Sequence, residues 1–179
     1  AGADGLCVAT LDEALALRQG AVGGPVHVLY PIPASGVADA AVHGLSVTVG
    51  DRTSEDRLLA AVADLPGDTS ALAVHVEVET GLGRGGIGIS ELATALDRLR
   101  GAAGVRPAAL WTHLQAPEDD EVTVAQLSLF DQAAEIARTA GSPLPRHVAA
   151  SAGTLTRNVP PYEGVRPGLD LDPGVEQLL

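Results

Sequence analysis

The feature that most constrains the fold is a regular alternation of two kinds of segment along the chain. Short runs rich in valine and leucine, typical of buried strands, alternate with longer alanine-rich amphipathic runs, typical of helices. Strict alternation of this kind indicates parallel strands that are joined by right-handed helical crossovers. We therefore predict one α/β domain over residues 1–179, with no linker that would divide it.

The expected elements follow from this pattern and from local start and stop signals. Thr10 and Glu13 form a capping-box pattern, and Pro31 ends a strand. The predicted strands are Gly5–Ala9, Val26–Tyr30, Leu45–Val49, Leu72–Glu79, Ala109–Leu114, His147–Ser151 and Gly164–Leu169. The predicted helices are Leu11–Gln19, Ala34–His43, Ser54–Ala63, Ser90–Leu99 and Val122–Ala140.

Two parallel architectures suit this order of elements. A doubly wound sheet is suggested by residues 81–86, which match the dinucleotide motif G-x-G-x-x-G. The glycines do not open a helix, however, because the next helix is expected only at Ser90, and no acidic partner for a ribose lies where it should. The alternative is a TIM (β/α)8 barrel of about 250 residues. We favour an incomplete barrel that is short by about one unit.

Composition excludes several classes of partner. The net charge of −12 argues against affinity for nucleic acid or an anionic membrane surface. No run approaches the roughly 20 apolar residues of a membrane span, so we expect a cytoplasmic protein. Cys7 has no internal disulfide partner and is expected to be a small buried residue. All 11 basic residues are arginine, and the absence of an initiator methionine leads us to expect a preceding segment.

Polar residues cluster where the predicted strands end. In a parallel barrel these ends share one rim, which carries the active site. Alternation over Val74–Glu79 places His75, Glu77 and Glu79 on one face of a strand, although an exposed edge strand would give the same pattern. The expected rim residues are Tyr30, Glu77, Arg84, His113, Ser151, Arg166 and Gly168.

Each rim residue also has a plainer interpretation. His113 could be a base, a metal ligand or a stacking surface, or simply a histidine satisfied by a backbone carbonyl. Ser151 could bind an anion or cap a helix, and Arg166 could belong to a phosphate loop or to a surface turn. We expect no metal, because no second or third ligand falls at a useful spacing; His27 and His43 are expected to be structural or exposed.

Five segments together resemble the N-terminal barrel of the alanine racemases, a family of enzymes that use pyridoxal 5'-phosphate (PLP). They occur in family order, with family-like spacing, over nearly the whole chain. The resemblance implies strands two to eight of that barrel, with the first strand missing and without the family's C-terminal β domain. The segments are Gly5–Ala14, Glu77–Arg84, Trp111–Leu114, His147–Ser151 and Gly164–Leu169.

The resemblance also implies roles for individual residues. His113 would lie against the cofactor's pyridine ring, and Arg166 would donate a hydrogen bond to the ring nitrogen. Ser151 would hold the phosphate together with the backbone near Gly168 and Leu169.

On the substrate side, Arg84 would lie near the cofactor's phenolic oxygen and would bind the substrate carboxylate. Glu77 occupies the position where many family members carry a carbamylated lysine, and it would orient Arg84 as that anion does. The activity implied is interconversion of L- and D-alanine for bacterial peptidoglycan synthesis, by a homodimer of the full-length protein.

Several departures from the family pattern qualify this expectation. The chain has no lysine to form the Schiff base with the cofactor, and Tyr30 and Tyr162 do not match the catalytic tyrosine of the partner subunit. Ala150 stands where asparagine is usual, and residues 171–173 place an acid close to the phosphate loop. No catalytic residue is therefore assigned, and the chain alone is expected to be inactive. The alternatives are an inactive relative of PLP-binding barrels and a scaffold protein.

Overall fold

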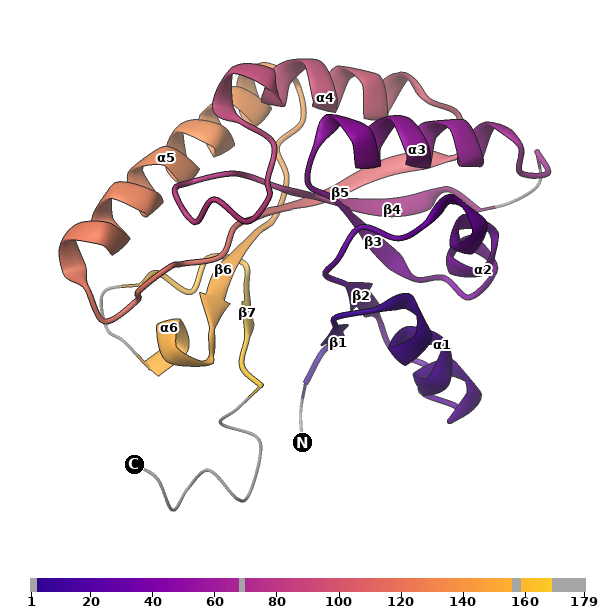
Figure 1. Ribbon diagram of the computed structural model, residues 1–179, viewed down its shortest axis with the longest axis horizontal. Coiled ribbons are helices and arrows are strands. Elements are labelled where there is room, and N and C mark those ends of the chain that lie inside the picture. Colours follow the sequence, from indigo (N-terminus) through magenta and orange to yellow (C-terminus); the bar gives the residue numbers. More distant parts are fainter. Residues whose placement is uncertain (1–2, 68–69, 156–158, 169–179) are drawn as a thin grey trace.

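A computed structural model describes residues 3–67, 70–155 and 159–168. Seven parallel strands form one sheet in the order of the sequence, and the sheet curls into an open barrel with the helices outside (Figure 1). This confirms the predicted α/β barrel. The strands are β1 Leu6–Val8, β2 Val26–Val28, β3 Ser46–Val49, β4 Leu72–Glu77, β5 Val105–Trp111, β6 Arg146–Ala150 and β7 Gly164–Arg166.

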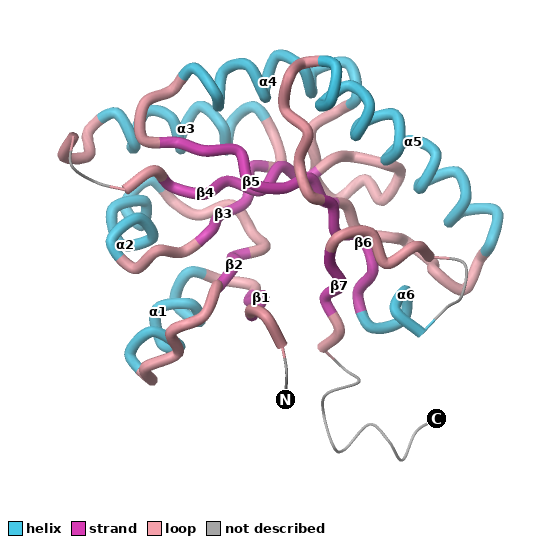
Figure 2. Tube along the Cα trace, turned by 180° about the vertical axis from the view of Figure 1, so that it is seen from behind, coloured by secondary structure: helices cyan, strands magenta, loops and turns pink. Residues whose placement is uncertain are grey.

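Helices connect successive strands and cover the outer face of the sheet, as Figure 2 shows from behind. Thr10 and Glu13 form the predicted capping box of the first helix. Among the described residues, no helix combines the length and apolarity that crossing a membrane would require. The helices are α1 Leu11–Gln19, η1 Ala34–Gly36, α2 Val37–Val42, α3 Arg52–Ala63, α4 Ile89–Gly101, α5 Asp120–Thr139 and α6 Ser151–Leu155.

The two faces of each strand have different roles. One face of β4 carries fully buried valines of the hydrophobic core, which the helices cover. They are Val74 and Val76 in the strand and Val78 directly after it. His75 and Glu77 alternate with these valines and so face the inside of the barrel. Polar side chains inside the barrel are thus a direct consequence of the alternation in the sequence.

β1 and β7 are the two edges of the sheet, and both views show them facing each other across its open side (Figures 1 and 2). This position overturns one expectation from the sequence. Cys7 on β1 is exposed rather than buried, because β1 has a neighbouring strand on one side only.

Other differences from the sequence prediction are shifts of element boundaries. β5 begins at Val105 rather than Ala109, and it includes Pro107 at the point where its register with β4 slips between Val74 and His75. An irregularity tolerates proline because one ladder hydrogen bond is already lost there. The predicted strand end at Ser151 is instead the start of α6. The predicted end of the last strand, Leu169, lies outside the described residues.

Candidate functional site

A cavity of about 960 Å³ lies along the open side of the barrel between β1 and β7, and it reaches the carboxyl-terminal ends of the strands. Arg84, His113, Arg166 and Gly168 line it, so four of the predicted site residues converge although they lie far apart in the sequence. Glu77 and Ser151 stand at the ends of β4 and β6 on the same rim. Further lining residues include Gly5, Leu6, Cys7, Leu29, Tyr30, Trp111, Ala150, Val165 and Pro167.

Arg166 is the most firmly held residue of this site. Its Nη2 donates to the backbone carbonyls of Thr112 (3.1 Å) and Val148 (3.0 Å), and its Nη1 donates to the carbonyl of His147 (3.0 Å) and to His147 Nδ1 (2.6 Å). Its guanidinium also stacks over Trp111 at 5.0 Å. Within the described part of the chain, Nε–H of Arg166 is left as a donor without a protein acceptor.

The surroundings of Arg166 shift its pKa in both directions. Burial lowers the pKa of Arg166 to about 10, while the neighbouring Cys7 and Glu77 raise it and Arg84 lowers it. A pKa of about 10 still leaves the guanidinium charged at neutral pH. Arg166 is therefore a permanent hydrogen-bond donor at the inner wall of the cavity.

Ser151 and Gly168, which the resemblance assigns to one phosphate site, contact each other in the structure. The amide of Gly168 donates to Ser151 Oγ at 2.8 Å, and this bond joins the start of α6 to the loop after β7. The pair brings a hydroxyl and a backbone amide, groups of the kind that bind anions, to one point of the rim, where the amide proton is engaged by Ser151 Oγ. Leu169, the third predicted member of this phosphate site, lies outside the described residues.

Glu77 and Arg84 are related less directly than the resemblance implies. No ion pair within 4.0 Å joins them among the described residues, although Arg84 lowers the pKa of Glu77 against the larger, raising effect of burial. Arg84 instead lies over the ring of Tyr30, 5.9 Å from its centroid. Any orientation of Arg84 by Glu77 acts through space rather than through a hydrogen bond.

Glu79, which the sequence grouped with Glu77, has a different role. It lies beyond the end of β4, and its carboxylate accepts hydrogen bonds from the amides of Gly81 and Gly83 (3.0 Å to the second). Glu79 thus holds the glycine-rich turn that carries Arg84. The turn does not open a helix, since α4 begins only at Ile89, which agrees with the case against a dinucleotide site.

His113 has a half-buried side chain at the edge of the cavity. Burial lowers its pKa, and the charges of Arg84 and Arg166 lower it further. The ring is therefore neutral at physiological pH. A neutral, flat imidazole at this position is suited to stacking against another ring.

A buried hydrogen-bond network supports this rim, and sequence reasoning missed it. Gln126 of α5 donates from Nε2 to Thr80 Oγ1 (3.0 Å) and to the carbonyl of His113 (3.2 Å), and its Oε1 accepts from Gln115 N (2.8 Å). Thr80 in turn bonds Thr112, 2.8 Å away. The one signal in the sequence was that Gln126 interrupts the apolar stripe of its helix, where a buried polar residue needs partners.

The fold also unites three histidines that the sequence left apart. His27, His75 and His147 come from β2, β4 and β6, and each offers a ring nitrogen within 4.8 Å of the others. His27, which the sequence suggested to be structural or exposed, is buried. The spacing argument against a second or third ligand does not hold in three dimensions, because alternate strands of a barrel contribute to one interior layer.

The fold and the rim together define a parallel (β/α) barrel of the kind that carries an active site at the carboxyl ends of its strands. The chain belongs to the family described as alanine racemase, N-terminal domain, whose model matches residues 1–171. Alanine racemases from Beutenbergia cavernae and Mycolicibacterium smegmatis are 33% and 34% identical to it, and the matches cover 94% and 96% of this chain.

Solved structures agree with this assignment. The alanine racemase of Bacillus anthracis with bound L-Ala-P superposes with a TM-score of 0.84 at 28% identity, over 99% of this chain and 47% of that one. The racemase of Corynebacterium glutamicum gives a TM-score of 0.82 at the same 28% identity. The chain spans about half the length of its relatives, with 46% and 45% of the two sequence relatives covered.

Proposed function

We propose that this chain is the PLP-binding barrel of an alanine racemase, and that the full-length protein interconverts L- and D-alanine as a homodimer. The observation that carries the proposal is Arg166, a charged donor fixed by three carbonyls and His147, with Nε–H still available for an acceptor. A pyridine nitrogen is such an acceptor. The rest of the longer protein would supply the other domain and the partner subunit's residues.

The residues present suit non-covalent binding of PLP. Bound PLP supplies an electron sink that makes the α-proton of an amino acid removable. Arg166 keeps its own proton and would leave the pyridine nitrogen unprotonated, which moderates that sink and favours racemisation over transamination. His113 would stack on the ring, and Ser151 with Gly168 would hold the phosphate. Arg84, which is exposed at the cavity mouth, would bind the substrate carboxylate.

Covalent anchoring does not fit the residues of this chain. The sequence contains no lysine, and neither Tyr30 nor Tyr162 stands where the family's second base would come from. A racemase needs one base on each face of the substrate's α-carbon, so we infer that the 179-residue chain binds PLP without racemising alanine. The absence of lysine also supports the second candidate, a catalytically inactive PLP-binding relative or scaffold.

PLP binding tests the proposal directly. Titrating the chain with PLP should quench the fluorescence of Trp111, the only tryptophan, which lines the cavity. Ser151→Ala should weaken binding about tenfold by removing a charge-assisted hydrogen bond. Ser128→Ala, on α5 and away from the cavity, is the matched control. Borohydride should fix no PLP to the chain. Absence of saturable binding would overturn the proposal, and a lysine-type adduct would refute the inference about anchoring.

A further inference from the structure

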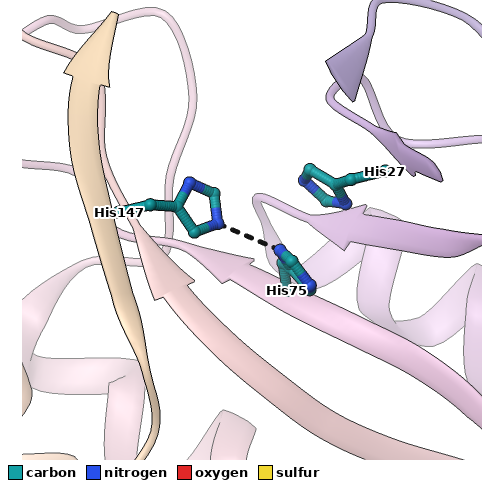
Figure 3. Close-up of side chains that lie close together, drawn as sticks. All are labelled: His27, His75 and His147. Carbon is teal, nitrogen blue, oxygen red and sulfur yellow. Dashed lines mark hydrogen bonds between the residues drawn. The ribbon is translucent and has the colours of Figure 1, made fainter. Parts of the chain in front are cut away.

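The inside of the barrel holds a cluster of imidazoles that the proposed function does not use. His27, His75 and His147 project from three alternate strands toward a common centre, as Figure 3 shows. None of the three lines the rim cavity. His43, by contrast, lies exposed at the end of α2.

We propose that His27, His75 and His147 form a binding site for a transition-metal ion of borderline softness, with Zn²⁺ preferred. Imidazole suits such ions, and three histidines with one open position are an established zinc arrangement. Zn–N bonds of about 2.0–2.1 Å place tetrahedral ligand atoms about 3.3 Å apart. His75 Nδ1 and His147 Nε2 are already 3.0 Å apart, and all three ligand atoms lie within 4.8 Å.

The distances between the rings show how closely the cluster already matches three imidazoles bound to one ion. The ring centroids of His75 and His147 are 5.1 Å apart and those of His27 and His147 are 5.8 Å apart, close to the roughly 5 Å of two imidazoles on one tetrahedral ion. His27 and His75 are stacked nearly parallel at 3.9 Å, so their in-plane lone pairs converge on one ion only after one ring turns. Binding therefore requires His27 to turn out of this stack, while His75 and His147 keep nearly their present spacing.

The hydrogen bonds of His27 leave it able to make that movement. Its two nitrogens face Ser46 Oγ (3.2 Å) and Thr48 Oγ1 (3.3 Å). Both hydroxyls also donate to backbone carbonyls, Ser46 to Val26 (3.3 Å) and Thr48 to Val28 (3.0 Å). While their protons point to these carbonyls, the hydroxyls can only accept from His27, and the unprotonated nitrogen of the neutral ring keeps its lone pair. A metal ion would use that lone pair.

The rings are ready to bind because they carry no extra proton. Burial, as the main cause, lowers the pKa of His27 to about 2, that of His75 to about 4 and that of His147 to about 2. No ring therefore carries a second proton at neutral pH, and the one ring proton that an ion must displace is that on His147 Nε2. The charge of Arg166 opposes a cation, but Glu77 lies close enough to offset part of it.

The protons of the cluster can be counted. Arg166 has only N–H donors, so His147 Nδ1 accepts at 2.6 Å, and the proton of neutral His147 sits on Nε2. His147 Nε2–H then donates to His75 Nδ1. An ion entering between these nitrogens replaces that proton, which leaves to solvent. His147 becomes an imidazolate whose negative charge lies between the ion and the guanidinium of Arg166.

Metal binding can be followed on the whole chain, expressed without a histidine tag and stripped with a chelator. Dialysis against Co²⁺ should load one ion per chain, give the visible bands of tetrahedral cobalt and quench Trp111, whose ring is stacked 5.9 Å from that of His147. Zn²⁺ should displace the Co²⁺. No saturable loading, or octahedral cobalt spectra, would overturn the proposal.

Variants locate the ion. His27→Gln and His75→Gln should each weaken binding about tenfold or more, while His43→Gln should leave it unchanged. Equal binding by all variants would place the ion elsewhere and overturn the proposal. In case the variants fold poorly, X-ray absorption on the loaded wild-type chain counts the ligands. Three imidazoles on zinc support the site, and fewer than three contradict it.

Discussion

Arg166 combines burial with a permanent charge, two properties that rarely coexist in one residue. A buried charge is tolerated only when its hydrogen bonds are satisfied. Arg166 meets this condition almost entirely with backbone carbonyls, from Thr112, His147 and Val148. Carbonyls add no opposing charge, so the guanidinium keeps its donor strength for a ligand in the cavity. The same residue then fixes the tautomer of His147, and so couples the rim to the barrel interior.

Two glycines of the turn before α4, Gly83 and Gly86, allow the tightness of this turn to be tested by single substitutions. Gly86 has a φ of 111°, and a Cβ there would meet the amide nitrogen of Glu79 at 2.3 Å. Gly83 has a φ of 71°, but a Cβ there would meet nothing within 4 Å. We expect Gly83→Ala to cost about 1–2 kcal/mol of stability, and Gly86→Ala more than about 3 kcal/mol.

Urea unfolding of both glycine variants would measure this difference. The two substitutions are chemically identical and both require a positive φ, so the difference between them reports the backbone clash at Gly86 together with the greater strain of its φ of 111°. Equal costs for the two would show that the turn rearranges freely, contrary to the tight return of Gly86 onto Gly50, whose carbonyl accepts from its amide at 2.7 Å.

At the scale of elements, the order of strands and helices and the residues at the strand ends could be predicted from the sequence, but the contacts inside the barrel could not. Alternation along β4 was enough to direct Glu77 inward, and turn residues placed Arg84 and Arg166 at strand ends. The start of β5 was predicted at Ala109 rather than Val105, because the register slip that accommodates Pro107 within the strand depends on the neighbouring strand. The histidine cluster could not be predicted, since 48 residues separate His27 from His75 and 72 separate His75 from His147.

The packing of α5 against the rim depends on one buried amide. Gln126 is 3% exposed and bonds two loops at once. Gln126→Leu should cost about 2–4 kcal/mol, because it removes the partner of the His113 carbonyl and of the Gln115 amide and leaves Thr80 bonded to Thr112 alone. Gln132→Leu on the same helix is exposed and should change stability by less than about 0.5 kcal/mol. Urea unfolding compares the two, and equal effects would contradict the role given to Gln126.

For the molecule as a whole, the open side of the barrel is its weakest feature. β1 and β7 each lack a partner on one edge among the described residues, and both present apolar side chains there, Leu6 at 40% and Val165 at 41% exposure. Exposed strand edges promote association. We expect the chain to self-associate with rising concentration, and Leu6→Lys with Val165→Lys to reduce this. Sedimentation velocity measures it; a stable monomer at all concentrations would contradict the expectation.

Sensitivity to acid follows from the three histidines inside the barrel, in the metal-free protein. In the unfolded chain they would titrate near pH 6.5, whereas in the folded chain their pKa values are lowered to about 2, 4 and 2 by burial, with Arg106 and Arg166 lowering that of His75 further. Above about pH 6.5 the rings are neutral in both states and cost nothing. Below it, only the unfolded chain takes up these protons, so the folded state loses stability as the pH falls.

The size of this loss can be bounded, because each histidine contributes up to about 1.4 kcal/mol per pH unit. Three of them should lower the free energy of unfolding by about 4 kcal/mol between about pH 7.5 and 5.5. Urea unfolding at the two pH values tests this, and His27→Gln should remove about one third of the difference. A free energy that stays constant would mean that the cluster is solvated or protonated in the folded chain. Neutral imidazoles packed in one dry barrel layer would then be excluded.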